Sequence, residues 1–258
     1  RKADVVCVRD SISENWANRL RTGKEIHLTA DSAMQRILSP RELDAQIRTT
    51  NVRLPADRIK VGITAIDLSW HPVYGKKKKL ETINECMISE LAQVIKYLLD
   101  DKRALVYFYP QLYGNQNDVP VIERITRRLS GAGLDIEDGI VVLDPLQTSD
   151  YQQAHISKMD FFICTRYHSL VFSAMYCVPF ISLFYEHKSE DLVNRLNMNK
   201  YSLPIKDINA TVIIKLFEEG IEQTDAIKKG LAEKMQRLNA LSFKNTLLLY
   251  ELYRKDSA

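Results

Sequence analysis

Three consecutive polar residues, Arg166, Tyr167 and His168, separate two apolar runs in the middle of the chain. The run before them, 161–164, is typical of a strand that is buried on both faces, and the run after them is typical of a buried helix. A helix start presents unpaired N–H groups and partial positive charge, to which a guanidinium and an imidazole add their own donors. The pattern therefore predicts a site for an anion, above all a phosphate or a carboxylate.

A second strand, predicted at 180–185, ends close to Glu186 and Lys188. Ligands of doubly wound sheets bind outside the carboxyl ends of the strands, so we expect these two side chains to face one crevice with Arg166 and His168. Alternative roles stay open for Arg166 and His168. Arg166 could pair with a neighbouring carboxylate, and His168 could cap the helix. Tyr167 is expected to pack rather than to react.

The composition excludes several classes of protein. The chain has 258 residues and is 45% hydrophobic, which allows one or two domains. Its net charge of +3 is too small to indicate nucleic acid as a main partner. No signal peptide and no apolar run of about 20 residues is visible, so we expect a cytoplasmic protein. The sequence starts with arginine and enters a strand-like run at once, which suggests part of a longer protein.

Histidine and cysteine spacing predicts neither a metal site nor a disulfide framework. The histidines show no HxxxH or HExxH pattern, and the cysteines form no CxxC pair. Cysteines within apolar runs usually behave as small buried side chains. We therefore expect a reducing compartment, no metal and no cofactor.

Alternating apolar strands and helices predict an α/β fold, a Rossmann-like parallel sheet with helices on both faces. Between the second and third strands, residues 39–58 lose the pattern and are interpreted as a linker. Asn245 interrupts the apolar stripe of the long final helix. Strands are expected at 4–10, 25–31, 59–67, 104–111, 139–144, 161–164 and 180–185, and helices at 11–23, 80–101, 119–133, 147–158, 168–177 and 224–255.

The stretch from Asp160 to Lys188 resembles the signature of the polysaccharide pyruvyl transferase family. Its members carry Arg-x-His after an apolar strand, then a buried helix, a proline, a strand and Tyr-x-x-Lys. The matching residues here are Arg166, His168, Pro179, Tyr185 and Lys188.

Two weaker segments agree with this resemblance, which extends from residue 4 to about 200. "VRDSISENWAN" looks like the family's first strand–helix junction, and "YPQLYGNQND" looks like its later strand end followed by Asn-Asp. Family members usually have a longer N-terminal domain before the first of these segments. The matching residues are Arg9, Asp10, Ser13, Asp31, Asn117 and Asp118.

The resemblance implies the C-terminal half of a glycosyltransferase-B-like architecture, in which two Rossmann-like domains face a cleft. Residues 1–38 would be the remnant of the first domain and 39–56 a linker. Residues 57–221 would form the second domain with the anion site. Residues 222–258 would be a helix that crosses back towards the first domain.

The implied reaction moves a pyruvyl group from phosphoenolpyruvate to two hydroxyls of a sugar as a ketal, in cell-surface or exopolysaccharide biosynthesis. His168 would act as general acid or leaving-group stabiliser and Arg166 as anion clamp, with Glu186 or Asp118 as candidate base. The acceptor would be a sugar or a lipid-linked saccharide, which could bring the protein to a membrane surface. The substrate-binding residues would be Arg9, Asn117, Asp118, Tyr167, Ser169, Glu186 and Lys188.

Two other classes of function stay open. A nucleotide-sugar glycosyltransferase or epimerase of the same fold would place basic groups on a diphosphate and a carboxylate on a ribose, for which Glu190 or Asp191 could serve. A homologue without activity would only bind sugars or anions.

Overall fold

A parallel sheet of six strands forms the centre of the protein in the computed structural model, which describes residues 3–21, 23–69, 71–72, 77–113 and 116–256. The strand order is β10-β9-β8-β3-β4-β7, and every neighbouring pair is parallel. The predicted α/β class is therefore confirmed. The strands are β3 (Lys60–Ile63), β4 (Leu105–Phe108), β7 (Ile140–Val142), β8 (Phe161–Cys164), β9 (Phe180–Phe184) and β10 (Ser202–Pro204).

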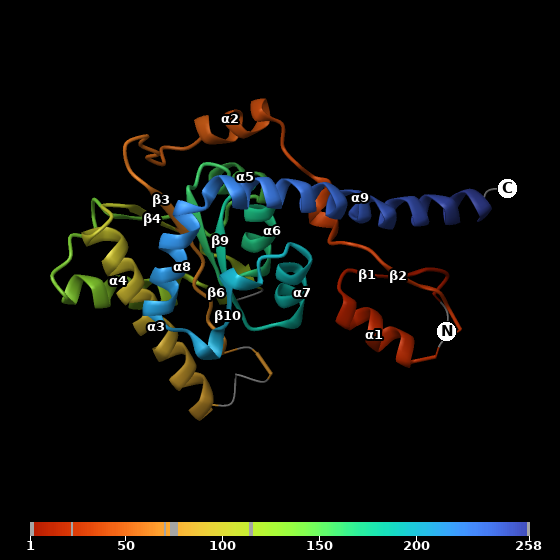
Figure 1. The fold of residues 1–258 in the computed structure, drawn as a ribbon, viewed down its shortest axis with the longest axis horizontal. Coiled ribbons are helices and arrows are strands. Elements are labelled where there is room, and N and C mark those ends of the chain that lie inside the picture. The colour runs from red at the N-terminus through yellow and green to blue at the C-terminus, as the bar shows by residue number, and fades with distance from the viewer. Residues whose placement is uncertain (1–2, 22, 70, 73–76, 114–115, 257–258) are drawn as a thin grey trace.

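Helices cover both faces of this sheet, as the sequence predicts (Figure 1). On one face α3 contacts α4 and α8, and on the other α6 contacts α5 and α7. Strands between two helical layers are buried on both sides, which explains why β4 and β8 are continuous apolar runs. The helices are α3 (Lys77–Asp100), α4 (Val119–Gly131), α5 (Ser149–Ile156), α6 (Tyr167–Met175), α7 (His187–Arg195) and α8 (Ala210–Glu222).

The strand order reverses between β3 and β8. From β3 the chain adds β4 and β7 on one side, then returns to add β8, β9 and β10 on the other. Such a reversal leaves a crevice outside the carboxyl ends of the two central strands, where α/β proteins bind their ligands. Thr64 and Arg166 follow these two strands, so the topology places them at the crevice.

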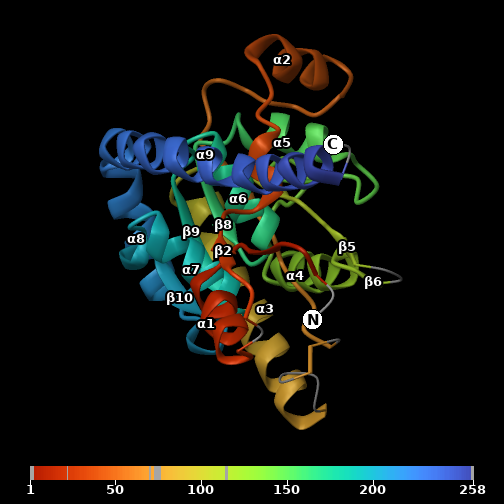
Figure 2. The same cartoon turned by 90° about the vertical axis from the view of Figure 1, so that its right-hand side faces the viewer.

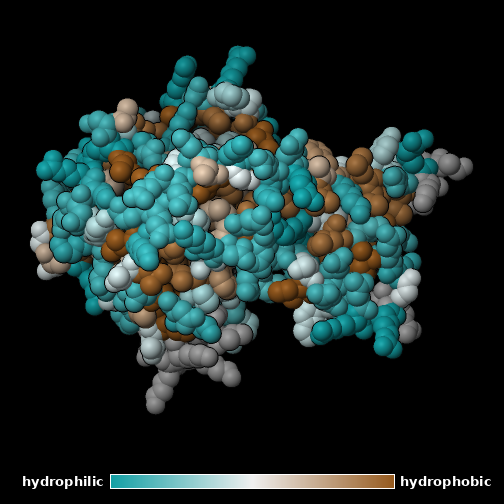
Figure 3. Space-filling view, in the orientation of Figure 1, coloured by the Kyte–Doolittle hydropathy of each residue, from teal (hydrophilic) through white to brown (hydrophobic). Residues whose placement is uncertain are grey.

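Residues before the linker form a smaller lobe. Strand β1 (Val6–Val8) pairs in parallel with β2 (Ile26–Leu28), and α1 (Ser11–Arg19) connects them. The N-cap of α1 is Asp10, whose carboxylate accepts a hydrogen bond of 2.7 Å from the N–H of Ser13. A furrow separates this lobe from the larger body in the space-filling view (Figure 3).

The predicted linker contains a helix that the sequence reading missed. Helix α2 (Pro40–Arg48) begins with a capping box, in which Ser39 and Glu42 each accept a hydrogen bond from the other's backbone N–H. The helix packs on α5, so this stretch is not simply an irregular connection.

The final helix α9 (Thr224–Asp256) bridges the two parts of the molecule. It contacts α6 of the larger body and the short 3₁₀ helix η1 (Ser32–Gln35) that follows the smaller lobe (Figures 1 and 2). Asn239 and Asn245 donate side-chain hydrogen bonds of 2.6 and 3.0 Å to the carbonyls of Met34 and Ala30. Asn245 therefore interrupts the apolar stripe because it binds the backbone of another segment.

Three further pieces complete the described chain. A short antiparallel hairpin follows β4, and two 3₁₀ helices flank β10. These pieces are β5 (Leu112–Tyr113) with β6 (Gln116–Asn117), η2 (Asn199–Tyr201) and η3 (Ile205–Asp207).

Within the described ranges, no helix has the length and apolar character needed to cross a bilayer.

Candidate functional site

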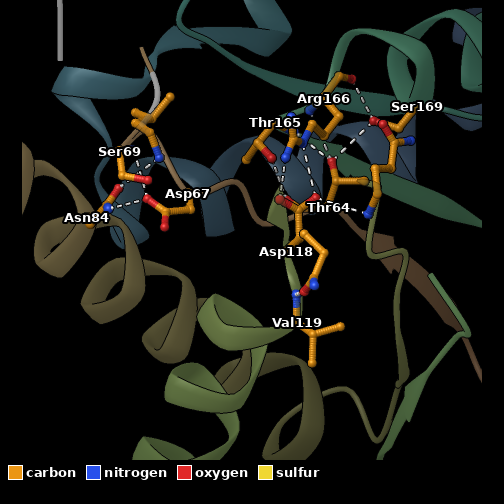
Figure 4. A network of polar contacts seen from close by, with 12 residues as sticks. Thr64, Asp67, Ser69, Asn84, Asp118, Val119, Thr165, Arg166 and Ser169 are labelled. Carbon is orange, nitrogen blue, oxygen red and sulfur yellow. Dashed lines mark hydrogen bonds and ion pairs between the residues drawn. The ribbon is translucent and has the colours of Figure 1, made fainter. Parts of the chain in front are cut away.

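A hydrogen-bond network fixes the start of α6 against the end of β3 (Figure 4). The hydroxyl of Thr64 accepts hydrogen bonds from the N–H groups of Thr165 and Arg166, at 2.8 and 3.2 Å. It also lies 3.1 Å from the hydroxyl of Ser169, which in turn donates to the Arg166 carbonyl at 2.7 Å. Ser169 is fully buried and its hydroxyl is engaged in this network, so the substrate contact predicted for Ser169 stays a prediction.

Arg166 pairs with Asp118 beneath the crevice. The guanidinium donates from Nε to Oδ2 at 3.0 Å and from Nη2 to Oδ1, which ties the end of β8 to the start of α4 (Figure 4). The Asp118 side chain is 0% exposed and that of Arg166 is 10% exposed. Burial raises the pKa of Asp118 above its ordinary value of 3.8, although Arg166 acts in the opposite direction.

The pairing of Arg166 with a neighbouring carboxylate, left open as an alternative, is what the structure shows. The expectation that its guanidinium faces an open crevice is wrong here, because Asp118 lies within the fold and engages two of its nitrogens. The direct role of Arg166 as an anion clamp stays a prediction. The sequence could not reveal this pair, because its partners are 48 residues apart.

Asn117 caps the helix that Asp118 precedes. Its side-chain oxygen accepts a hydrogen bond of 3.0 Å from the N–H of Val119, the first residue of α4. The contact with substrate predicted for Asn117 is not tested by this arrangement.

Two cations from different parts of the chain lie close to the ring of Tyr167. The guanidinium carbon of Arg9, in the smaller lobe, is 4.9 Å from the ring centroid, and the ammonium of Lys188, in α7, is 5.5 Å from it. Burial raises the pKa of Tyr167 well above its ordinary value, so the phenol is neutral at physiological pH. The residue packs, as expected, and its ring sets the positions of two positive charges.

Each of the two cations also has a carboxylate partner. Arg9 pairs with Asp31, and the Lys188 ammonium lies 2.5 Å from a carboxylate oxygen of Glu186. A strongly charged anion could compete for both cations, because both pairs are only partly buried.

His168 is the exposed member of the polar triplet. Partial desolvation lowers the pKa of its imidazole below the ordinary value of 6.5; the nearby charges of Arg9 and Lys188 lower it further, and Asp31 opposes them. At neutral pH the ring is therefore mainly uncharged, and an added anion beside it would favour protonation.

Two cavities lie near this triplet. The larger, of about 810 Å³, lies between the smaller lobe and the strand ends; Arg9 and Lys188 line it together with Asp10 and Glu186. The smaller, of about 430 Å³, is lined by His168 and Phe172 of α6 together with residues of α5 and of the connection before it. The structure thus brings four sequence-predicted residues to the charged cavity or its border and places His168 at the neighbouring one: Arg9, Tyr167, Glu186 and Lys188.

Two helices begin near the charged cavity without a side-chain cap. The N-caps of α6 and α7 are Arg166 and Glu186, and neither side chain accepts a hydrogen bond from its own helix. Backbone N–H groups at such positions favour anions. Combined with Arg9 and Lys188, this arrangement is suited to a ligand that carries more than one negative charge.

Sequence reasoning overlooked several residues that line the charged cavity. No site role was predicted for His71 or His187, and both line the cavity; the His71 ring is 5.6 Å from that of Tyr185, and His187 Nε2 is 3.8 Å from an Asp10 oxygen. Position after a strand end was the available signal for His187, which directly follows Glu186.

Asp191 does not have the open position that a ribose contact would need. Its carboxylate accepts hydrogen bonds from the backbone N–H, at 3.2 Å, and from the hydroxyl of Ser11, which joins α1 to α7. Glu190 is exposed in the first turn of α7. In the part of the chain that the structure describes, no cluster of three His, Cys, Asp or Glu side chains could hold a metal ion.

Comparisons with known proteins agree with the fold and identify a sequence family. A family model described as polysaccharide pyruvyl transferase matches residues 1–187. A sequence comparison with curated proteins found no match.

Two solved structures show the fold class. An α,α-trehalose 6-phosphate synthase from Burkholderia multivorans aligns with a TM-score of 0.61 at 10% identity, over 99% of this chain and 61% of that chain. A Listeria monocytogenes protein, provisionally assigned as a UDP-N-acetylglucosamine 2-epimerase, aligns with a TM-score of 0.61 at 11% identity, over 98% and 61%. These likenesses show a glycosyltransferase-B-like fold, and the chain spans about 61% of the length of these neighbours.

Proposed function

Because the chain belongs to the polysaccharide pyruvyl transferase family, we propose that it transfers a pyruvyl group from phosphoenolpyruvate to two hydroxyls of a saccharide. The product is a cyclic ketal, and the second product is inorganic phosphate. The family match supports this proposal, and the charged cavity with its two cations offers the donor a binding site.

The chemistry balances without an oxidant or reductant. The methylene carbon of phosphoenolpyruvate takes up a proton, and one sugar hydroxyl forms a bond to the adjacent enol carbon and loses its proton. The bond from that carbon to the phosphate oxygen breaks, and the second hydroxyl adds there. Of the two hydroxyl protons, one replaces the proton taken up by the methylene carbon and the other leaves with phosphate.

The donor binds where the cations of two chain segments converge. Arg9 and Lys188 both lie close to the ring of Tyr167, in the first turn of α6, whose start has no side-chain cap. Phosphoenolpyruvate carries a phosphate and a carboxylate close together, so two cations that line the same cavity can neutralise both groups. On binding, Arg9 and Lys188 exchange their carboxylate partners for the donor.

His168 supplies a proton at the donor. Its pKa is lowered in the free protein by partial desolvation and by Arg9 and Lys188. The bound anion offsets these effects and raises the pKa, so donor binding itself loads the general acid. As phosphate leaves, the protonated ring also stabilises the developing negative charge.

Arg166 and Asp118 position the site in this proposal. Their buried pair fixes the first turn of α6, and with it the ring of His168 and the backbone N–H groups. Of the two candidate bases, Glu186 lines the charged cavity whereas Asp118 is enclosed, so the base role falls to Glu186.

The observation that carries the proposal is the placement of Arg9 and Lys188 at 4.9 and 5.5 Å from the ring centroid of Tyr167, next to His168. The experiment is an assay of phosphate release from phosphoenolpyruvate in the presence of saccharides, with Lys188→Met as the test variant. We expect saccharide-dependent release and a higher KM for phosphoenolpyruvate in the variant. Turnover of a nucleotide sugar without phosphoenolpyruvate consumption would favour the glycosyltransferase alternative.

A further inference from the structure

The cavity that His168 lines and the larger charged cavity differ in the chemistry of their walls. Fixed charges line the larger one, where Arg9, Asp10, Glu186 and Lys188 gather. The described lining of the smaller cavity contains no aspartate, glutamate, lysine or arginine, and its one titratable side chain is that of His168. A multiply charged anion favours the first environment, and a neutral polyhydroxylated ligand suits the second.

Side-chain amides dominate the polar lining of the smaller cavity. Gln111 and Gln152 both line it and are joined by a hydrogen bond of 3.3 Å from Gln111 Nε2 to Gln152 Oε1. This bond leaves the Gln111 carbonyl oxygen and the Gln152 amide nitrogen without another side-chain partner among the described residues. One acceptor and one donor side by side match the needs of neighbouring hydroxyl groups, each of which donates and accepts.

An apolar wall completes the cavity. Phe172 lies one helical turn after His168 on α6, and their ring centroids are 6.2 Å apart. Leu146, in the connection between β7 and α5, is exposed at the opposite side. A pyranose has polar edges and C–H faces, so a wall of this kind beside amide groups suits it. The volume of about 430 Å³ falls within the range of about 300–1,000 Å³ that is usual for small-molecule sites.

We infer that this amide-lined cavity is the acceptor subsite and binds a neutral hexopyranose unit, with Gln111, Gln147 and Gln152 as its hydroxyl-binding residues. The inference rests on the proposed function, because it places the acceptor beside the imidazole that is proposed to protonate the donor. His168 lines the acceptor cavity, and the charges of Arg9 and Lys188, which line the donor cavity, lower the pKa of its imidazole. The His168 ring lies 5.6 Å from that of Tyr167, near which Arg9 and Lys188 also lie, so two substrates can bind in neighbouring cavities.

The fold also explains why the sequence did not indicate these glutamines as site residues. Gln111 follows β4, Gln147 lies in the β7–α5 connection, and Gln152 belongs to α5. Only the fold brings the three segments together beside α6.

Saturation-transfer-difference NMR on the whole chain tests the inference with methyl hexopyranosides as probes. Gln152→Leu and Gln147→Leu each remove an amide, and Gln93→Leu is the matched control on the exposed side of α3. We expect sugar binding to weaken about tenfold in the two test variants, the loss of roughly one hydrogen bond of about 1.4 kcal/mol. The control should bind as the wild type does, and thermal unfolding verifies that each variant is folded.

A competition experiment separates the two subsites. We expect phosphoenolpyruvate to leave bound sugar in place, and Lys188→Met to weaken phosphoenolpyruvate binding while sugar binding persists. The inference is overturned if none of the sugars binds, if both glutamine variants bind as the wild type does, or if phosphoenolpyruvate displaces the sugar competitively. Failure of phosphoenolpyruvate to bind, with the sugar results as expected, would instead count against the proposed function alone.

Discussion

Arg166 donates two hydrogen bonds to the carboxylate of Asp118, and the pair lies almost entirely out of solvent. It joins the end of β8 to the start of α4 across the point where the strand order reverses. Removing one partner leaves an uncompensated buried charge, which costs far more than loss of an exposed pair.

Asp118→Ala is expected to lower the free energy of unfolding by about 3–5 kcal/mol because Arg166 then stays buried without a partner. Arg53→Ala serves as the control, because its partner Asp138 is 64% exposed and such a surface pair contributes about 0–1 kcal/mol. Urea unfolding measures both. Equal losses in the two variants would show that the buried pair has no special structural role.

Gly62 has a steric requirement that is testable in the same way. A Cβ atom at this position of β3 would lie 2.2 Å from the ring of Phe162, its partner on β8. Gly62→Ala should therefore cost about 1–3 kcal/mol through overpacking. Phe162→Leu in the same chain should recover part of this loss, and strictly additive effects in the double variant would contradict the proposed clash.

His155 makes stability depend on pH. Burial lowers the pKa of its imidazole from 6.5 to about 4, and no hydrogen-bond partner of its Nδ1 exists among the described residues. Below pH 6.5 the unfolded chain gains a proton that the folded chain takes up only near pH 4, so this contribution to stability falls as the pH drops through that window. The predicted loss is on the order of 3 kcal/mol.

Urea midpoints between pH 7 and 4 measure this effect, with His155→Phe as the comparison. The variant should show a shallower fall than the wild type across the window. Parallel curves would assign the acid sensitivity to other groups.

The pH dependence of turnover tests the loading of His168 by the donor. Its pKa is lowered in the free protein, and a bound anion is expected to raise it. The basic limb of kcat/KM for phosphoenolpyruvate, which reports the free protein, should therefore lie at lower pH than the basic limb of kcat. A limb that persists in His168→Gln belongs to the substrate, and coincident limbs in the wild type would exclude this coupling.

Much of the fold could be predicted from the sequence because most strands of the sheet are apolar runs between turn residues; β10, which is Ser-Leu-Pro, is not such a run and was not predicted. The run before Arg166 is buried on both faces, as β8 shows. Helix α2 escaped because its apolar residues are few, although Ser39 and Glu42 carried a readable capping signal. The site was predictable only in part. The sequence locates charged groups at strand ends, but it does not show that Arg166 turns inward to Asp118.

The most direct test of the account follows the enol carbon of phosphoenolpyruvate, labelled with carbon-13, during incubation with the protein and a hexopyranoside acceptor. We predict phosphate release matched by a new ketal carbon resonance, and a loss of about 10²–10⁴-fold in rate for His168→Ala, the range for a general acid. The variant should unfold at nearly the wild-type temperature, because His168 is exposed, whereas Phe162→Ala should cost about 3–5 kcal/mol. Undiminished ketal formation in folded His168→Ala, or turnover of a nucleotide sugar in place of phosphoenolpyruvate, would contradict the account.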